Sequence, residues 1–176
     1  MITYYIESAK EIFLSLFIAG LSTFCTGQGP APTMNSLTCL EKADAEKILG
    51  QPARITENTT EKTDSSAKYR CTYTADRTEA SSGKLGHVYY MFETYRSENV
   101  SKKVYTQIFS QNASMPHLDT IKNLGDEALR HTDNENFDMI IVRKGNKIVR
   151  IKVNRLTKMT SAFELLVVAE KITASL

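Results

Sequence analysis

Two apolar runs, Phe137-Asp-Met-Ile-Ile-Val-Arg143 and Lys147-Ile-Val-Arg-Ile-Lys-Val153, flank the short segment Lys144-Gly-Asn146. Both runs are rich in the β-branched residues that favour strands, and a connection containing Gly and Asn is typical of a tight antiparallel turn. The sequence therefore predicts a β-hairpin here, as part of a larger antiparallel sheet.

Four more strands are predicted before this hairpin, and the last of them follows a turn within Leu124–Leu129. The first three cover residues 52–58, Lys68–Thr74 and Leu85–Tyr95, with a polar loop at Glu61–Ala67 between the first two. The third is the most aromatic segment of the chain, and its alternating side chains form two sets. One set is Val88, Tyr90 and Phe92, and the other is His87, Tyr89 and Met91. Because both sets are largely apolar or aromatic, we expect a central strand that is covered on both faces.

Three helices are predicted from their start signals, which are Thr38 with Glu41, Ser97, and Ser161 with Glu164. The first helix is expected to end at Gly50, which suits a left-handed cap. The second covers residues 98–112, and the third runs to the end of the chain. The order of helix, strands, helix, strands and helix indicates the α+β class, with a mainly antiparallel sheet flanked by helices.

The N-terminal residues have the layout of a secretory signal. Ile12–Leu21 is uncharged and apolar, and small or polar residues follow it up to Gly27. We therefore expect a signal peptide at 1–27, a flexible tether at 28–36 and a single domain at 37–176. Lipidation of Cys25 and cleavage after Gly27 are both open as processing routes, and a buried helix of the domain is the competing interpretation.

An exported chain meets an oxidising compartment, in which Cys39 and Cys71 can form a disulfide. Two buried free thiols are the alternative. Structural zinc needs four ligands in close pairs and a redox dithiol usually has the form Cys-x-x-Cys, and neither pattern is present.

The sequence contains no catalytic or metal-binding motif. His87, His117 and His131 lie far apart, and the chain lacks both His-Glu-x-x-His and Gly-x-Ser-x-Gly. No metal and no cofactor are therefore expected. The formal net charge of +2 is too small to indicate a nucleic acid as partner.

A basic stretch from Arg143 to Lys158 contains no acidic residue. On the predicted strand, Arg150 and Lys152 point away from the apolar side chains. The candidate residues for binding an anionic ligand are Arg143, Arg150, Lys152 and Arg155. The alternative is a solvated face whose lysines discourage strand pairing at the edge of the sheet.

Several short motifs resemble a family of small bacterial cell-envelope lipoproteins of unknown function. These motifs are the helix Cys39-Leu-Glu-Lys-Ala-Asp-Ala-Glu-Lys-Ile-Leu-Gly50, Arg70-Cys-Thr-Tyr73, Leu124-Gly-Asp-Glu-Ala128 and Val142-Arg-Lys-Gly-Asn146. The resemblance covers residues 37–176 and implies a fold like that of Mog1 and PsbP, an α/β/α sandwich with a twisted antiparallel sheet. It brings no catalytic residues.

We therefore expect a non-enzymatic exported protein of the periplasm or cell envelope that touches a membrane only through an N-terminal lipid anchor. Its expected role is a protein-interaction or accessory module that uses the sheet or the loops around Asp126 and Thr132–Asn136. The alternative is a carrier or sensor of an anionic ligand or lipid headgroup, through the basic residues 143–158.

Overall fold

The computed structural model describes residues 40–176. The predictions for the signal peptide 1–27, the tether 28–36, and the cysteines Cys25 and Cys39 lie outside the described residues. Within the described part, no helix has the length and apolar character that a membrane span requires.

Seven strands form one sheet in the order β1-β2-β3-β7-β6-β5-β4, and all neighbours are antiparallel. The strands are β1 (Ala53–Lys62), β2 (Ser66–Ala75), β3 (His87–Tyr95), β4 (Leu118–Thr120), β5 (Glu127–Thr132), β6 (Phe137–Lys144) and β7 (Lys147–Asn154). The helices are α1 (Lys42–Leu49), α2 (Glu98–Asn112) and α3 (Ala162–Ala174). The predicted α+β class with an antiparallel sheet is confirmed.

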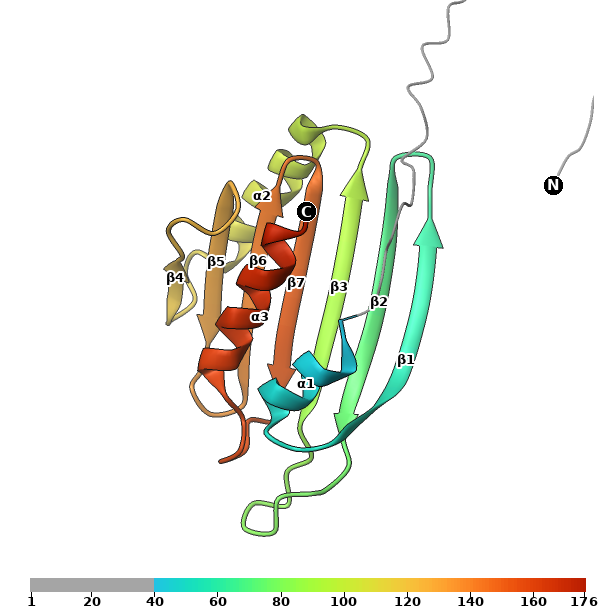
Figure 1. Cartoon of the computed structure of the whole chain (residues 1–176). Helices are drawn as coiled ribbons and strands as arrows, with labels where there is room; N and C mark the ends of the chain where they lie inside the picture. The colour runs from blue at the N-terminus through green and yellow to red at the C-terminus, as the bar shows by residue number, and fades with distance from the viewer. Residues whose placement is uncertain (1–39) are drawn as a thin grey trace, which may run out of the picture.

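The helices lie on both faces of the sheet (Figure 1). On what we call the first face, α1 and α3 bury the larger core, which includes Ile48, Leu165, Tyr90 and Ile151. On the second face, α2 buries a smaller core around Tyr105. The first face of the central strands is therefore fully covered, whereas the second face has only one helix on it.

Local signals placed several elements correctly. The β6–β7 hairpin forms as predicted, with a turn at Gly145 and Asn146. The Ser97 side chain accepts from the Val100 backbone N–H, and the Ser161 side chain accepts from that of Glu164. Each hydroxyl supplies a partner to an N–H that the first helical turn leaves unbonded.

The predicted start of the first helix was wrong. The helix begins at Lys42, and Glu41 is its N-cap residue, which makes no side-chain capping bond. Glu41 is therefore not the third helical residue that a capping box with Thr38 requires. The end was predicted correctly, because Gly50 adopts φ 66° and its N–H bonds to the carbonyls of Glu46 and Lys47.

The predicted polar loop at Glu61–Ala67 was also wrong. β1 continues to Lys62 and β2 begins at Ser66, so the two strands pair almost to the turn. The turn is stabilised by Thr63, whose Oγ1 accepts from the backbone N–H groups of Ser65 and Ser66. Polar residues extend this hairpin because β1 is an edge strand with both faces largely in water.

Candidate functional site

The register of the sheet brings side chains of distant segments together on the second face. Tyr89 of β3 lies directly opposite Lys152 of β7, and Lys152 lies opposite Met139 of β6. One row further along the strands, His87 lies opposite Asn154, and Asn154 lies opposite Phe137. Directly opposite residues point to the same face of a sheet, so these side chains share one surface.

We call this surface the open face, because α2 buries the other end of the second face, and of the apolar side chains here only Met139 packs against the core under α2. The open face consists of His87, Tyr89, Met91, Phe137, Met139, Lys152 and Asn154. Tyr89 is 37% exposed and the other side chains of the set are half-buried. The prediction that β3 is covered on both faces was therefore correct only for the end near Tyr95, which is buried.

Aromatic and cationic groups contact one another across the open face. The Lys152 ammonium lies 4.8 Å from the centroid of the Phe137 ring, a cation–π contact. Phe137 also meets the His131 ring edge to face at 4.9 Å, and His87 lies 6.1 Å from the Tyr89 ring. Because these rings sit on paired strands, the backbone ladder fixes their positions.

His87 lies at the edge of the open face nearest the 155–160 loop. Its Nδ1 is 3.0 Å from Oγ1 of Thr74. Burial, and then the positive charge of Arg155, lower the pKa of His87 below its usual 6.5. The Arg155 guanidinium therefore acts on the same region as Lys152, although Arg155 follows the end of β7.

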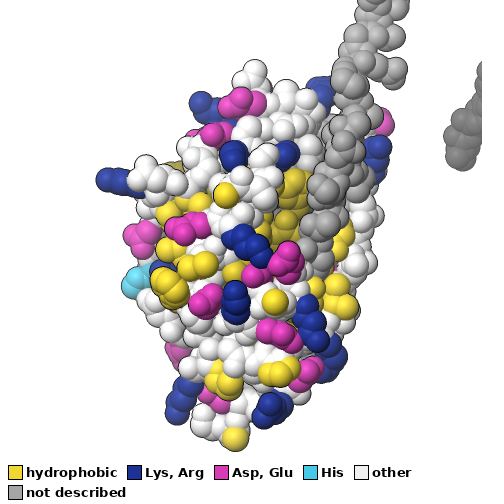
Figure 2. All heavy atoms as spheres, viewed as in Figure 1, with side chains coloured by type: hydrophobic (Ala, Val, Ile, Leu, Met, Phe, Trp, Pro, Cys, Tyr) yellow, Lys and Arg dark blue, Asp and Glu magenta, His cyan; other side chains and the backbone are white. Residues whose placement is uncertain are grey.

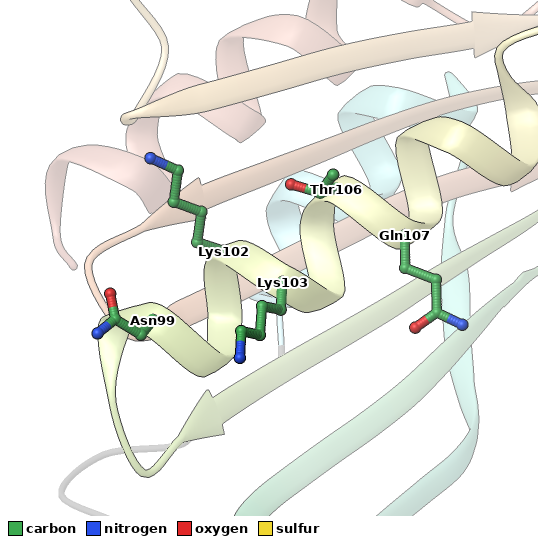
Figure 3. Close-up of a pocket in the computed structure, with 5 residues that line it drawn as sticks. All are labelled: Asn99, Lys102, Lys103, Thr106 and Gln107. Atoms are coloured by element: carbon green, nitrogen blue, oxygen red, sulfur yellow. The ribbon is translucent and has the colours of Figure 1, made fainter.

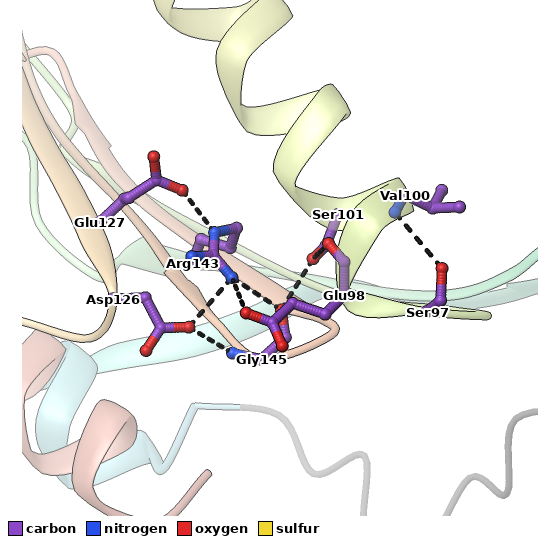
Figure 4. A network of polar contacts seen from close by, with 8 residues as sticks. All are labelled: Ser97, Glu98, Val100, Ser101, Asp126, Glu127, Arg143 and Gly145. Atoms are coloured by element: carbon purple, nitrogen blue, oxygen red, sulfur yellow. Dashed lines mark hydrogen bonds and ion pairs between the residues drawn. The ribbon is translucent and has the colours of Figure 1, made fainter.

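Two of the four basic residues that the sequence singled out are not available to an external anion. Arg143 is 4% exposed, and its guanidinium contacts Glu127 at 2.5 Å, Asp126 at 2.9 Å and Glu98 at 3.4 Å (Figure 4). Arg150 contacts Glu93 at 2.8 Å.

The remaining two, Lys152 and Arg155, make no ion pair within residues 40–176. The expectation that Arg143, Arg150, Lys152 and Arg155 form one accessible cationic surface is therefore not met. Charge alternation along a strand shows which way Arg150 points, but not that Glu93 of β3 lies beside it.

The Arg143 contacts form a junction between three elements. Ser101 of α2 donates its hydroxyl toward the carbonyls of Glu98 and Gly145, at 2.8 and 2.7 Å. The Gly145 N–H in turn donates to Asp126 over 2.7 Å. The start of α2, the start of β5 and the β6–β7 turn are thus held together around one buried guanidinium. The predicted interaction loop around Asp126 belongs to this junction.

The second predicted loop, Thr132–Asn136, is organised by its own carboxylate. Oδ1 of Asp133 accepts from the backbone N–H groups of Glu135, Asn136 and Phe137. These bonds, led by that of Phe137, place the pKa of Asp133 far below its usual range. The carboxylate therefore shapes a turn, and no group of His, Cys, Asp or Glu in residues 40–176 is arranged to hold a metal ion.

Two other surfaces are weaker candidates for a binding site than the open face. On the first face, acidic and basic side chains are interspersed (Figure 2), and Lys171 of α3 contacts Glu41 and Asp44 at 2.7 and 2.9 Å. On α2, five exposed polar side chains line a hollow of about 550 Å³ (Figure 3). These are Asn99, Lys102, Lys103, Thr106 and Gln107. In the described part of the chain a single helix supplies all of them, so they do not form an enclosed site.

Cys71 lies in the first-face core and is 1% exposed. The residue after Cys39 reaches the same strand, because the Tyr73 hydroxyl donates to the Leu40 carbonyl over 2.9 Å. Leu40 itself is buried in that core.

No family model matches this chain, and no curated protein and no solved structure matches it either. The candidate site therefore stands on the geometry of residues 40–176.

Proposed function

We propose that the chain is a non-enzymatic, exported cell-envelope protein that binds a partner protein through the open face. The observation that carries this proposal is the partly exposed row of Tyr89, Lys152 and Met139 on a rigid sheet. Aromatic residues and Met are enriched in the centre of protein interfaces, where they supply contact area at a small cost in conformational entropy.

The surroundings of the row fit the same role. Beside it, Arg150 and Glu93 already neutralise each other, so a partner would not have to bury their charges unpaired. Burial and the charge of Arg155 lower the pKa of His87, which favours its neutral imidazole. The surface is thus amphipathic rather than strongly charged, which favours a protein over a polyanion.

Export and the Cys39–Cys71 disulfide are part of the proposal. They are supported by the apolar Ile12–Leu21 segment and by the buried position of Cys71. Leu40, the residue after Cys39, accepts a hydrogen bond from the side chain of Tyr73. Tyr73 lies two residues after Cys71 on β2. We also propose the Mog1/PsbP-like fold, which helices on both faces of an antiparallel sheet support.

Site-specific photo-crosslinking tests the proposed binding face. The photoreactive residue p-benzoylphenylalanine is placed at position 91 on the open face or at position 103 on the solvent side of α2. Both versions are expressed with the full leader in a bacterium that exports the chain. We expect a discrete protein adduct from position 91 that disappears when Tyr89→Glu is added.

Position 103 is the matched control, since Lys103 is exposed and lies on α2, outside the open face. The same adduct from both positions, or no adduct from position 91, would contradict the proposal.

A further inference from the structure

Lys152 and Arg155 are cations without a carboxylate partner in the described chain, beside an aromatic surface. We propose that the open face binds an acidic, apolar peptide segment of its partner, with a carboxylate seated between Lys152 and Arg155. This inference rests on the proposed function and names the chemistry of the partner.

The placement of the two cations follows from the register. Lys152 lies opposite Tyr89, and His87, two residues earlier on β3, lies opposite Asn154. Arg155 follows Asn154 directly, and its backbone, at φ 57°, turns there and donates to the carbonyl of Asn136 over 2.6 Å. Lys152 therefore lies beside Tyr89, and Arg155 follows the strand position beside His87 and acts on its imidazole.

The acids nearest in the sheet are already occupied. Glu93 is 4% exposed and contacts Arg150 at 2.8 Å and Lys68 at 3.5 Å. Asp138 lies opposite Val153 and therefore points to the first face of the sheet, where it contacts Arg130 at 2.6 Å. Glu93 cannot turn to Lys152 without breaking its buried contacts, and Asp138 points to the other face, so neither of these strand acids neutralises Lys152. A carboxylate of a partner can take that place.

The apolar part of the segment would lie on Tyr89, Phe137 and Met139. A carboxylate held there is partly shielded from water, which strengthens its charge-assisted hydrogen bonds to lysine and arginine. A partner with a basic segment would meet two uncompensated like charges on the same surface, so the arrangement selects the sign of its ligand.

A peptide fits this surface better than a membrane does. Basic segments that recognise anionic lipids carry clusters of about 4–8 lysine or arginine residues. The open face and its border have two cations without an ion pair among the described residues, Lys152 and Arg155, and Tyr89 is only 37% exposed. Two charges and a half-buried aromatic ring are too few for lipid recognition but sufficient to orient one acidic side chain.

Panning a library of random twelve-residue peptides against the purified full chain tests the inference. We expect the enriched peptides to combine Asp or Glu with aromatic or aliphatic residues. The double variant Lys152→Glu/Arg155→Glu should weaken binding of the enriched peptides by about tenfold or more, since two attractive contacts become repulsive. Lys102→Glu/Lys103→Glu, with the same change in net charge on α2, should leave affinity within about twofold.

Each other outcome has a definite meaning. Enriched peptides without acidic residues, or unchanged affinity in Lys152→Glu/Arg155→Glu, overturn the inference. If Tyr89→Ala still abolishes their binding, the open face remains the binding surface and only the proposed ligand chemistry fails. If Tyr89→Ala has no effect either, both proposals fail. Co-sedimentation with phosphatidylserine vesicles that depends on Lys152 and Arg155, with no peptide enriched, would assign the surface to lipid instead. Circular dichroism of every variant confirms that it is folded.

Discussion

The Nε of Arg143 donates to Oε2 of Glu127 over 2.5 Å, and this joins the end of β6 to the start of β5. The same guanidinium reaches Glu98 in the first turn of α2. Since Arg143 is 4% exposed and its three acidic partners are all more accessible, one buried cation holds three peripheral carboxylates.

Replacing this cation is expected to loosen α2 from the sheet. Arg143→Met should lower the free energy of unfolding by about 2–3 kcal/mol, a range typical of losing hydrogen bonds to charged groups. Part of the loss is offset because Asp126 and Glu98 can return to water. Urea unfolding followed by circular dichroism measures it. Lys102→Met, on the exposed side of α2, should change stability by less than about 0.5 kcal/mol, and an equal loss in both variants would contradict a special role for Arg143.

Two glycines with similar backbone angles should respond differently to alanine. Gly50 has φ 66° and Gly83 has φ 68°. A Cβ at Gly83 would meet nothing within 4 Å, whereas at Gly50 it would collide with the backbone carbonyl of Met159. Gly83→Ala should destabilise by about 1 kcal/mol from the left-handed conformation alone. Gly50→Ala should cost about 1–3 kcal/mol more, because the loop after β7 must move. Thermal unfolding of the two variants measures the difference in stability that the collision with Met159 causes. Equal losses of stability in both variants would mean that the Met159 loop lies further from α1.

Removing a neighbouring positive charge should raise the pKa of His87. Arg155→Gln is expected to do this, whereas Lys158→Gln, in the same loop, should not, since only Arg155 acts on the imidazole. NMR titration of the His87 ring measures the shift. An unchanged pKa in Arg155→Gln would show that Arg155 does not lie close enough to act on the His87 imidazole.

The lowered pKa of His87 also makes the folding stability depend on pH. A lowered pKa means that the folded protein disfavours the imidazolium, so stability is present above pH 6.5 and is lost as the pH falls from 6.5 through the folded pKa. Arg155→Gln should reduce this acid loss.

The proposed Cys39–Cys71 disulfide makes two measurable predictions. Intact mass should rise by about 2 Da on reduction of two sulphurs, and the mature mass should also report the cleavage site and any acyl chains on Cys25. Cys39→Ser should lower stability by about 3–4 kcal/mol under oxidising conditions, as expected for a loop of this length. Cys39→Ser is preferred to a change at Cys71, which is buried in the core and would add a packing loss. Equal stability of wild type and Cys39→Ser would exclude the bond.

Local chemistry explains which parts of the fold the sequence could predict. The caps at Ser97 and Ser161 and the β6–β7 hairpin each depend on a few neighbouring residues. The β1–β2 hairpin was misjudged because its strands are polar. A strand in water needs no apolar alternation, so hydrophobic pattern gives no signal for residues such as Glu61.

The site depended on contacts that no local pattern contains. The sequence put His87, Tyr89 and Met91 on one strand face, and Arg150 and Lys152 on another. Only the pairing of β3 with β7 puts Tyr89 opposite Lys152 and brings Glu93 to Arg150. The ion pairs of Arg143 likewise depend on Glu98 of α2 and Glu127 of β5, which are distant from it along the chain. Charge counts therefore overestimated the cationic surface.

The pairing of β3 with β7 also constrains how the molecule is made. These central strands come from opposite halves of the chain, with Thr94 facing Lys147. A growing or translocating polypeptide can assemble β1, β2 and β3 early, yet their apolar edge stays unpaired until β7 emerges. Until then the half-finished sheet is vulnerable to aggregation, and a chaperone that shields β3 should raise the yield of native protein.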